Sequence, residues 1–364
     1  MKKIIVSVTN DVANDQRVSK VCDTLYNLKY DVSLVGRKLS NSKNLKRHYP
    51  IKRFKLLFNK GVLFYIEFNI RLFFYLLFSK SDILLANDLD TLLPNFIVSR
   101  IKNKELVYDS HELFPEIPEL LQRPFKKKIW KTLERILLPY LKNCYTVSDS
   151  IAHYYKEEYN THFNVVRNIP ILSKTKTRNF TKVPFKITKK KIVLYQGAVN
   201  VGRGIELMIE AIDILTDCYF LIIGHGDIFE EINKLVSQKN LNNKVYFLGK
   251  IAPQELKDIT PLAHVGISIE EDLGLSYRYS LPNKIFDYIH AQIPVITSNL
   301  PEMKKIVHQY KIGEVLEERT PERLAEKIEY TLNKNYSANL KNAKKELTWG
   351  NEEIIIKRIF NSFE

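Results

Sequence analysis

The 364-residue sequence is poor in cysteine, and its three cysteines, Cys22, Cys144 and Cys218, lie far apart. They form no CxxC pair and no cysteine–histidine spacing typical of a zinc site, which argues against a disulfide framework and a structural zinc. The N-terminus has only a short apolar run before polar residues follow, a pattern typical of a first strand rather than a signal peptide. We therefore expect a cytoplasmic protein.

The sequence also lacks helix-turn-helix spacing, a zinc finger and an RNP-type aromatic signature, although its net charge is +15. The charge is uneven. Residues 1–170 hold 28 Lys and Arg against 17 Asp and Glu, residues 171–191 hold 8 against none, and residues 192–364 hold 20 against 24. The basic first half is expected to face an anionic surface or ligand. Without nucleic-acid motifs, we predict no nucleic-acid partner.

Apolar, β-branched runs alternate with helical patterns along the whole chain. In the first half these runs are 2–9, 31–37, 82–88, 105–111 and 143–150; in the second they are 191–198, 218–227, 244–250, 264–270 and 294–299. Continuous apolar strands separated by helices are typical of a parallel sheet that is covered on both faces.

The pattern therefore predicts an α/β protein with two doubly wound, Rossmann-like domains, at residues 1–170 and 192–346. Residues 171–191 are basic and aperiodic, and we predict that they form the linker. Ligands of open parallel sheets bind outside the carboxyl ends of the strands, so we expect the site in a cleft where the two domains face each other.

Two strand-end loops of the first half carry candidate residues. Asp15 and Arg17 stand near a helix start, where anionic groups are favoured, although a helix cap and a solvated arginine would explain them too. Asp109, His111 and Glu112 follow another strand. A histidine there can donate to a sugar hydroxyl or assist proton transfer, or it can be an ordinary hydrogen-bonded polar residue.

Two turns of the second half suit phosphate binding. Gly197 lets the backbone approach a ligand closely, and Arg203 at the end of the same turn offers its planar fork to phosphate oxygens. Gly224 and His225 lie in a Gly-x-Gly turn, a weaker signal for the wall of a phosphate or base pocket.

The densest group of polar residues lies between 270 and 299. The loop enters a helix through Ser280, Leu281, Pro282 and Asn283. The N–H groups of a helix start, together with Lys284 in the first turn, would hold a diphosphate, and Asp287 could accept hydrogen bonds from ribose hydroxyls. A helix cap followed by an amphipathic helix is the alternative.

Together these segments resemble the retaining GT-B glycosyltransferases of family 4, the glycosyl transferases group 1. The matching segments are NDQRV (14–18), VYDSHEL (107–113), YQGAVNVGRGIELMIEA (195–211), IIGHGD (222–227), VYFLGKIAPQEL (245–256) and LPNKIFDYIHAQIPVI (281–296). They occur in the family's order and cover nearly the whole chain.

The resemblance implies transfer of a sugar, with retention, from a nucleotide diphosphate sugar to a saccharide or lipid-linked acceptor, in surface polysaccharide assembly. The second domain would bind the donor, with Arg203 and Lys284 on the diphosphate, Asp287 on the ribose and the backbone near Ile251 on the base. His111 would contact the transferred sugar. Asp15, Arg17, Asp109 and Glu112 would lie on the acceptor side. Residues 347–364 would form a last helix that packs back on the first domain.

Three positions depart from the family pattern. Tyr279 stands where members carry the first acid of an E-x7-E motif, so Glu270 or Glu271 would supply that carboxylate. Ala198 replaces a frequent arginine, and Gln292 replaces a frequent glycine. The D-x-D in residues 87–90 lies in the first half, and we interpret it as structural or acceptor-facing. We predict no required metal and no cofactor beyond the donor.

Residues 61–78 are strongly apolar and aromatic, and basic residues precede them. Glu67, Asn69 and Arg71 interrupt the centre of this segment, so spanning a bilayer is not expected. The favoured interpretation of this helix is a core helix of the first domain; the alternative is a basic and aromatic edge that rests on an anionic membrane surface. Because the first half is basic, we expect an enzyme that is peripheral on the inner face of the cell membrane.

Two other functions remain open at this stage. One is a nucleotide-sugar epimerase or hydrolase on the same architecture, which needs no acceptor. The other is a non-catalytic nucleotide-sugar-binding protein, which Ala198 and Tyr279 make conceivable.

Overall fold

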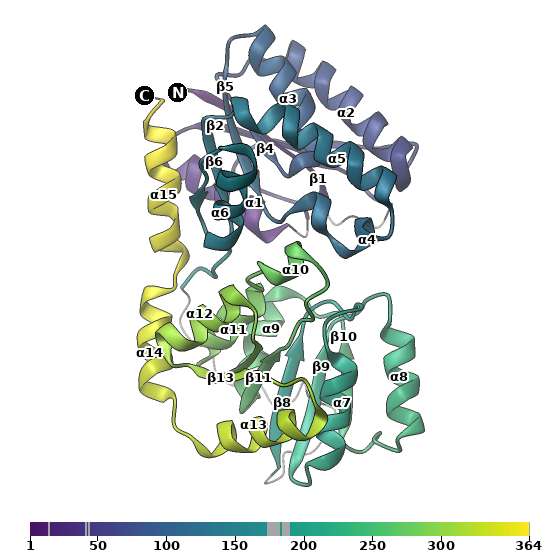
Figure 1. Cartoon of the computed structure of the whole chain (residues 1–364). Coiled ribbons are helices and arrows are strands. Elements are labelled where there is room, and N and C mark those ends of the chain that lie inside the picture. The colour runs from purple at the N-terminus through teal and green to yellow at the C-terminus, as the bar shows by residue number, and fades with distance from the viewer. Residues whose placement is uncertain (14, 41, 43, 173–182, 184–189, 364) are drawn as a thin grey trace. The chain divides into compact units, whose positions relative to one another are not determined.

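The protein forms two compact units (Figure 1). The computed structural model describes the chain except residues 14, 41, 43, 173–182, 184–189 and 364. Unit 1 comprises Met1–Asn168 and Glu352–Glu364, and unit 2 comprises Ile169–Asn351. Most of the predicted linker, 171–191, lies outside the described residues. The three cysteine thiols are buried and free.

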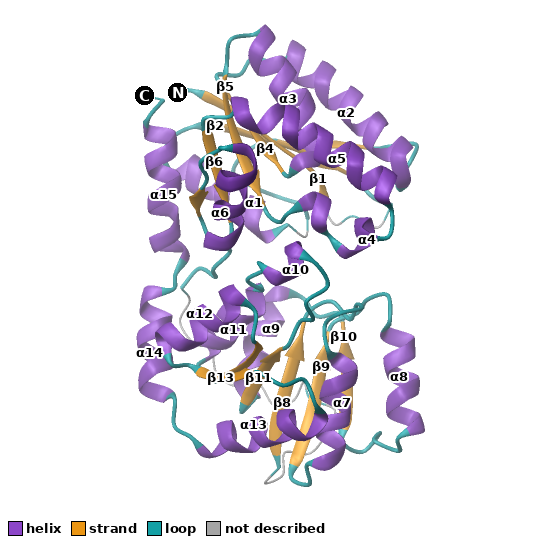
Figure 2. Cartoon of the chain, viewed as in Figure 1, coloured by secondary structure: helices purple, strands orange, loops and turns teal. Residues whose placement is uncertain are grey.

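Unit 1 is built on a seven-stranded sheet of order β3-β2-β1-β4-β5-β6-β7, and every pairing is parallel (Figure 2). The strands are β1 (Lys3–Asp11), β2 (Asp31–Arg37), β3 (Ile51–Phe54), β4 (Ile83–Asn87), β5 (Glu105–Ser110), β6 (Asn143–Thr146) and β7 (Asn164–Val165). The helices are α1 (Gln16–Asn27), α2 (Gly61–Phe78), α3 (Leu89–Ile101), α4 (Pro118–Leu121), α5 (Pro124–Leu137) and α6 (Asp149–Tyr159).

The last helix, α15 (Trp349–Asn361), belongs to unit 1 from Glu352 onward. The Tyr30 hydroxyl donates to the carbonyl of Phe360 at 2.9 Å, and their rings meet edge to face. Arg167 pairs with Glu352, whose carboxylate also accepts from the Arg167 backbone N–H at 2.7 Å. These contacts fix the C-terminal segment on the elements of unit 1.

Unit 2 is built on a six-stranded parallel sheet of order β10-β9-β8-β11-β12-β13. The strands are β8 (Lys191–Gln196), β9 (Cys218–Ile223), β10 (Val245–Gly249), β11 (Val265–Ser268), β12 (Val295–Ser298) and β13 (Gly313–Leu316). The helices are α7 (Ile205–Ile214), α8 (Phe229–Gln238), α9 (Pro253–Ile259), α10 (Leu275–Arg278), α11 (Asn283–Ala291), α12 (Pro301–Tyr310), α13 (Pro321–Asn333) and α14 (Ser337–Glu346). Two large apolar clusters pack helices against this sheet.

The predicted α/β class with two doubly wound parallel sheets is confirmed. The ten predicted strand segments all contain strands, and the three that the sequence patterns missed, β3, β7 and β13, are edge strands of two to four residues. These three edge strands are short and less covered than central strands, so they lack the longer apolar run that marks a buried parallel strand.

Helix α2 differs from the favoured prediction of a core helix. Only Phe64, Phe68, Leu72 and Leu76 are buried, and they pack on the sheet through residues that include Ile5 and Leu84. The remainder of the helix is half-buried or exposed, although its residues are mostly apolar. By length and composition alone, α2 is long and apolar enough to cross a bilayer, and no other described helix is.

Candidate functional site

The site in unit 2 begins where β8 and β9 end side by side. Gly197, at the end of β8, has φ +139°, and a Cβ there would lie 3.3 Å from Cε of Lys284. Gly224, at the end of β9, has φ +146°, and a Cβ there would lie 1.7 Å from the carbonyl oxygen of Gly197. Both positions require glycine because the backbone is left-handed and crowded. The backbone of Gly197, which carries no side chain, therefore lies next to the Lys284 side chain.

Lys284 stands in the first turn of α11 and points into a buried ionic cluster. Its Nζ lies 2.9 Å from Oε1 of Glu270 and over the ring of Tyr195, and its side chain is 9% exposed. Nη1 of Arg203 lies 3.6 Å from the same Glu270 oxygen, and its guanidinium stacks over Tyr277. One carboxylate therefore holds two cations that come from separate turns of the chain.

Glu270 follows β11 and is fully buried in the cluster. Burial alone would raise the pKa of Glu270, but Lys284 and Arg203 outweigh burial and hold this pKa below its usual range. The Ser268 hydroxyl donates to its other oxygen at 2.8 Å. The cluster of Glu270, Lys284 and Arg203 carries a net charge of about +1, and such a site favours an anion.

Asp287 lies one turn beyond Lys284 on α11. Its Oδ2 accepts from Nε2 of Gln196 at 3.0 Å, and Oε1 of Gln196 accepts from the Thr260 hydroxyl at 2.8 Å. The buried Tyr288 hydroxyl accepts from the Gln196 backbone N–H at 3.2 Å. Helix α11 is thereby attached to the end of β8, which sets the position of both Lys284 and Asp287.

Glu271, the second carboxylate considered from the sequence, occupies a different environment. It is half-buried and pairs with Arg319 at 3.7 Å. Arg319 also donates to the carbonyl oxygen of Ile269 at 2.9 Å and contacts the Ser298 hydroxyl at 3.2 Å. The sequence patterns missed Arg319. The feature of the sequence that could have indicated Arg319 is a cation shortly after the edge strand β13, since the carboxyl end of this strand lies at the same sheet edge as the other site residues.

The other predicted donor-side residues lie around the start of α11 and on the neighbouring turns. Pro282 precedes the helix, Asn283 is its exposed first residue, and Leu281 is buried in the core. The Ser280 hydroxyl donates to the carbonyl of Tyr277 at 2.8 Å. His225 is exposed and stacks on Phe229, and Ile251 packs against the core cluster of unit 2.

In unit 1, His111 is held between two carboxylates. Its Nδ1 lies 3.1 Å from Oδ2 of Asp88, and its Nε2 lies 3.1 Å from Oδ2 of Asp109. Its backbone N–H donates to Oδ1 of Asp88 at 2.9 Å. Burial alone would lower the pKa of His111, but Asp88 and Asp109 raise it well above its usual value. The ring is therefore an imidazolium that donates from both nitrogens.

Arg17 completes this network from α1. Its guanidinium meets Asp109 at 2.8 and 3.0 Å and donates to the carbonyl of Val166 at 2.8 Å, and both side chains are buried. Arg17 and Asp109 therefore position His111 rather than offer themselves to a ligand. Asp15 caps α1 by accepting from the Val18 N–H at 3.0 Å, and Glu112 is exposed beside His111.

The D-x-D segment does not form a metal site in this network. Asp88 binds His111, and Asp90 is buried and accepts from the Thr9 hydroxyl at 2.6 Å. Burial raises the pKa of Asp90 to about 8. Within the described part of the chain, no group of three or more His, Cys, Asp or Glu side chains could hold a metal ion.

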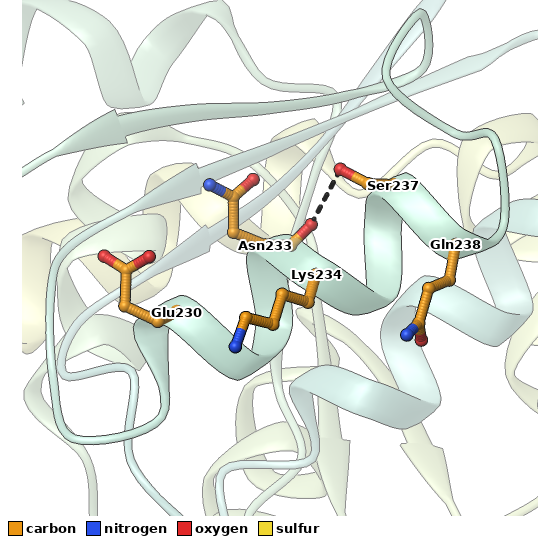
Figure 3. A pocket seen from close by; sticks show the side chains of 5 residues that line it. All are labelled: Glu230, Asn233, Lys234, Ser237 and Gln238. Carbon is orange, nitrogen blue, oxygen red and sulfur yellow. Dashed lines mark hydrogen bonds between the residues drawn. The ribbon is translucent and has the colours of Figure 1, made fainter.

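A shallow surface pocket lies along α8, and none of the residues of the two ionic clusters lines it. Figure 3 shows its lining, Glu230, Asn233, Lys234, Ser237 and Gln238, all on one helix. The Ser237 hydroxyl donates to the carbonyl of Asn233 at 3.1 Å. A row of polar side chains on one exposed helix lacks the convergent groups of a binding site.

The fold is that of the GT-B glycosyltransferases. Sucrose-phosphate synthase from Thermosynechococcus elongatus superimposes with a TM-score of 0.81, at 16% sequence identity, over 100% of this chain and 99% of that one. The Anabaena protein HepE, solved with UDP and glucose, superimposes with a TM-score of 0.77, at 13% identity, over 100% of both chains.

The family is visible in the second half of the sequence. Residues 176–347, which make up most of unit 2, match the family model of the glycosyl transferases group 1. A curated relative, alpha-D-kanosaminyltransferase of Streptomyces kanamyceticus, is 28% identical over 149 residues, which are 39% of this chain. The match spans 36% of the relative's own length.

The buried cluster yields a stability prediction. Lys284→Met leaves the buried Glu270 with the more distant Arg203 alone, so the free energy of unfolding should fall by about 3–5 kcal/mol. The double variant Lys284→Met, Glu270→Gln removes the uncompensated charge and should recover most of that loss. Chemical denaturation of both variants measures the difference. Equal stabilities of the single and double variants would contradict the ionic cluster.

The His111 network yields a pH prediction. Because the folded-state pKa is raised above the ordinary 6.5, the stabilisation is fully present below about pH 6.5 and is lost as pH rises through the folded-state pKa. His111→Gln should therefore lower the melting temperature more at pH 6 than at pH 9. The loss of folding free energy should be larger at pH 6 by about 1–2 kcal/mol. Melting curves of both proteins across this range check it, and a pH-independent difference would count against the imidazolium.

Proposed function

We propose that this protein is a glycosyltransferase that moves a sugar from a nucleotide diphosphate sugar to a saccharide or lipid-linked acceptor. The observation that carries the proposal is the cluster of Lys284, Arg203 and Glu270 beside the bare backbone of Gly197. We further propose that it acts in the cytoplasm, in surface polysaccharide assembly, and that the anomeric configuration is retained.

The cluster suits a departing diphosphate. As the anomeric C–O bond breaks, the sugar gains oxocarbenium character and negative charge grows on the leaving phosphate oxygen. Lys284 and Arg203 lie next to the first turn of α11, where backbone N–H groups favour an anion. In our proposal these fixed groups stabilise the leaving group, and no metal is needed.

Glu270 supports this role by holding the side chains of both cations in place before the donor binds. The acceptor hydroxyl would attack the anomeric carbon on the face from which the diphosphate departs. Its proton would pass to the departing phosphate oxygen, so that no protein nucleophile forms a covalent intermediate. In our proposal Glu270 supplies the carboxylate that is absent at position 279, where this chain has a tyrosine.

Asp287 is our candidate for the ribose. Asp287 accepts from Gln196, and because a carboxylate has about four acceptor sites it could also accept hydrogen bonds from ribose hydroxyls. The nucleotide to test first is UDP, since the structurally similar HepE was solved with UDP and glucose. The kanosaminyltransferase match supports sugar transfer as the reaction class.

His111 is our candidate for contact with the transferred sugar. With both N–H groups donated to Asp88 and Asp109, an imidazolium at His111 has no third N–H for a sugar hydroxyl and no lone pair with which to accept a proton, so it would act on the sugar through its positive charge. We therefore assign it an electrostatic and orienting role, and not that of a general base.

The donor site is tested by nucleotide titration. UDP, GDP and ADP are added without metal and in the presence of a chelator, and the melting temperature is recorded. We expect a rise with one nucleotide, and at least about tenfold weaker binding in Lys284→Met and in Arg203→Gln, because each loses a charge-assisted contact to phosphate. Lys234→Met, on the exposed face of α8, is the matched control. No shift with any of the nucleotides would reject the donor site.

Transfer is tested with the nucleotide sugar that binds best. Release of the nucleotide diphosphate should require an added lipid-linked or free saccharide acceptor, and the anomeric proton coupling of the product should match that of the donor. Release without an acceptor would indicate a hydrolase, and inversion at another sugar carbon an epimerase. Binding without either reaction would favour the non-catalytic alternative.

A further inference from the structure

Helix α2 has two apolar faces, and only one of them is used by the fold. Phe64, Phe68, Leu72 and Leu76 form the buried stripe at a spacing of four residues. A second stripe at the same spacing is exposed: Val62 (55%), Ile66 (49%), Ile70 (53%), Phe74 (52%) and Phe78 (80%). A soluble domain rarely leaves such a stripe in water without a partner for it.

The apolar surface continues onto two neighbouring helices. The connections from β3 to β4, β4 to β5 and β5 to β6 run the same way along the sheet, so right-handed crossovers place α2, α3 and α5 on one face. Helix α3 packs against both others (Figure 1). The rings of Tyr65 and Trp130 also join α2 to α5. Exposed apolar side chains on α3 and α5 are Leu93, Ile97, Ile101, Phe125, Ile129 and Ile136. We call this surface the α2–α3–α5 face.

Cations flank this face, and the acids on its helices are already engaged. Six basic residues lie on α5 or immediately before it: Arg123, Lys126, Lys127, Lys128, Lys131 and Arg135. Glu67 on α2 accepts the N–H groups of Leu57 and Phe58 and pairs with Arg71 at 2.7 Å. Glu134 on α5 is buried and accepts from the Tyr159 hydroxyl at 2.7 Å. Lys127 pairs with Glu116 at 2.7 Å and Lys131 with Glu158 at 3.6 Å, so the positive rim consists mainly of Arg123, Lys126, Lys128 and Arg135.

We propose that the α2–α3–α5 face docks on an anionic lipid bilayer, with α2 lying in the plane of the interface. Exposed aliphatic and aromatic side chains would enter the boundary between headgroups and acyl chains, while the lysines and arginines would contact lipid phosphates. Docking of this kind goes beyond the sugar transfer proposed above and does not depend on it.

Helix α2 docks without spanning the bilayer. Its buried stripe packs with Ile5, Val35 and Leu84 of the sheet, and moving the helix into a membrane would expose this core. Self-association through the face is disfavoured, because two copies would bring their basic rims together. An anionic bilayer satisfies both the apolar stripe and the positive rim.

The full chain is tested by co-sedimentation with vesicles of phosphatidylcholine, with or without about 30% phosphatidylglycerol. We expect binding to the anionic vesicles that weakens at least about tenfold when salt rises from about 0.1 to about 0.5 M. The variant Ile66→Ser, Ile70→Ser, Phe74→Ser should bind at least about tenfold more weakly. Its matched control, Ile214→Ser, Tyr330→Ser, Ile354→Ser, removes equally exposed apolar side chains elsewhere and should bind like the wild type.

A charge variant tests the rim. Arg123→Gln, Lys126→Gln, Lys128→Gln should weaken binding at least about tenfold, whereas Lys234→Gln, Lys304→Gln, Lys341→Gln has the same net charge and should not. Fluorescence of Phe74→Trp should be quenched by brominated acyl chains, and that of Ile214→Trp should not. Absence of wild-type binding at low salt, or equal losses in the variants and their controls, overturns the proposal. So does a wild-type dimer that the Ile66, Ile70 and Phe74 substitutions dissociate without any vesicle binding.

Discussion

The burial of one carboxylate, Glu270, determines the arrangement of the candidate donor site. An isolated carboxylate out of water is costly, so Glu270 is stable there only with Lys284 and Arg203 beside it. This requirement joins the turn after β8 to the first turn of α11. It also leaves two cations facing a strand end whose glycine backbone admits a ligand. The ion cluster is thus a structural constraint and, in our proposal, the anion site.

Unit 1 solves a similar problem at the end of β5. Asp109 is buried, and Arg17 and His111 surround it as Lys284 and Arg203 surround Glu270. Burial alone would raise the pKa of Asp109, but the two cations hold it low. In both units a buried carboxylate at the carboxyl edge of the sheet fixes the orientation of its cationic neighbours. In unit 1 His111 is the more exposed of the two cations, with 19% of its side chain exposed against 3% for Arg17.

The sequence was sufficient for what is local and insufficient for what is long-range. Central strands were predicted because burial on both faces produces continuous apolar runs. The placement of Lys284 and Asp287 on the first turns of a helix was predicted because the loop and the helix start that position them are adjacent in the chain. Gln196, Thr260 and Arg319 were missed, since their roles come from partners 50 to 91 positions away. For helix α2, the sequence predicted the helix but not the exposure of its second apolar face. Periodicity alone does not show how far an apolar helix turns away from its own core.

The uneven charge of the chain would affect a small bound phosphate and an extended membrane surface in different ways. Residues 192–364 have more acids than bases, yet this half holds the candidate site for a diphosphate. Screening reduces the effect of remote exposed charges beyond about 8 Å, so a bound phosphate would respond mainly to Lys284 and Arg203 beside it. A membrane is different, because its surface would meet many cations of the first half at once, each within that distance. The positive excess of residues 1–170 is therefore better matched to an extended anionic surface than to a single small ligand.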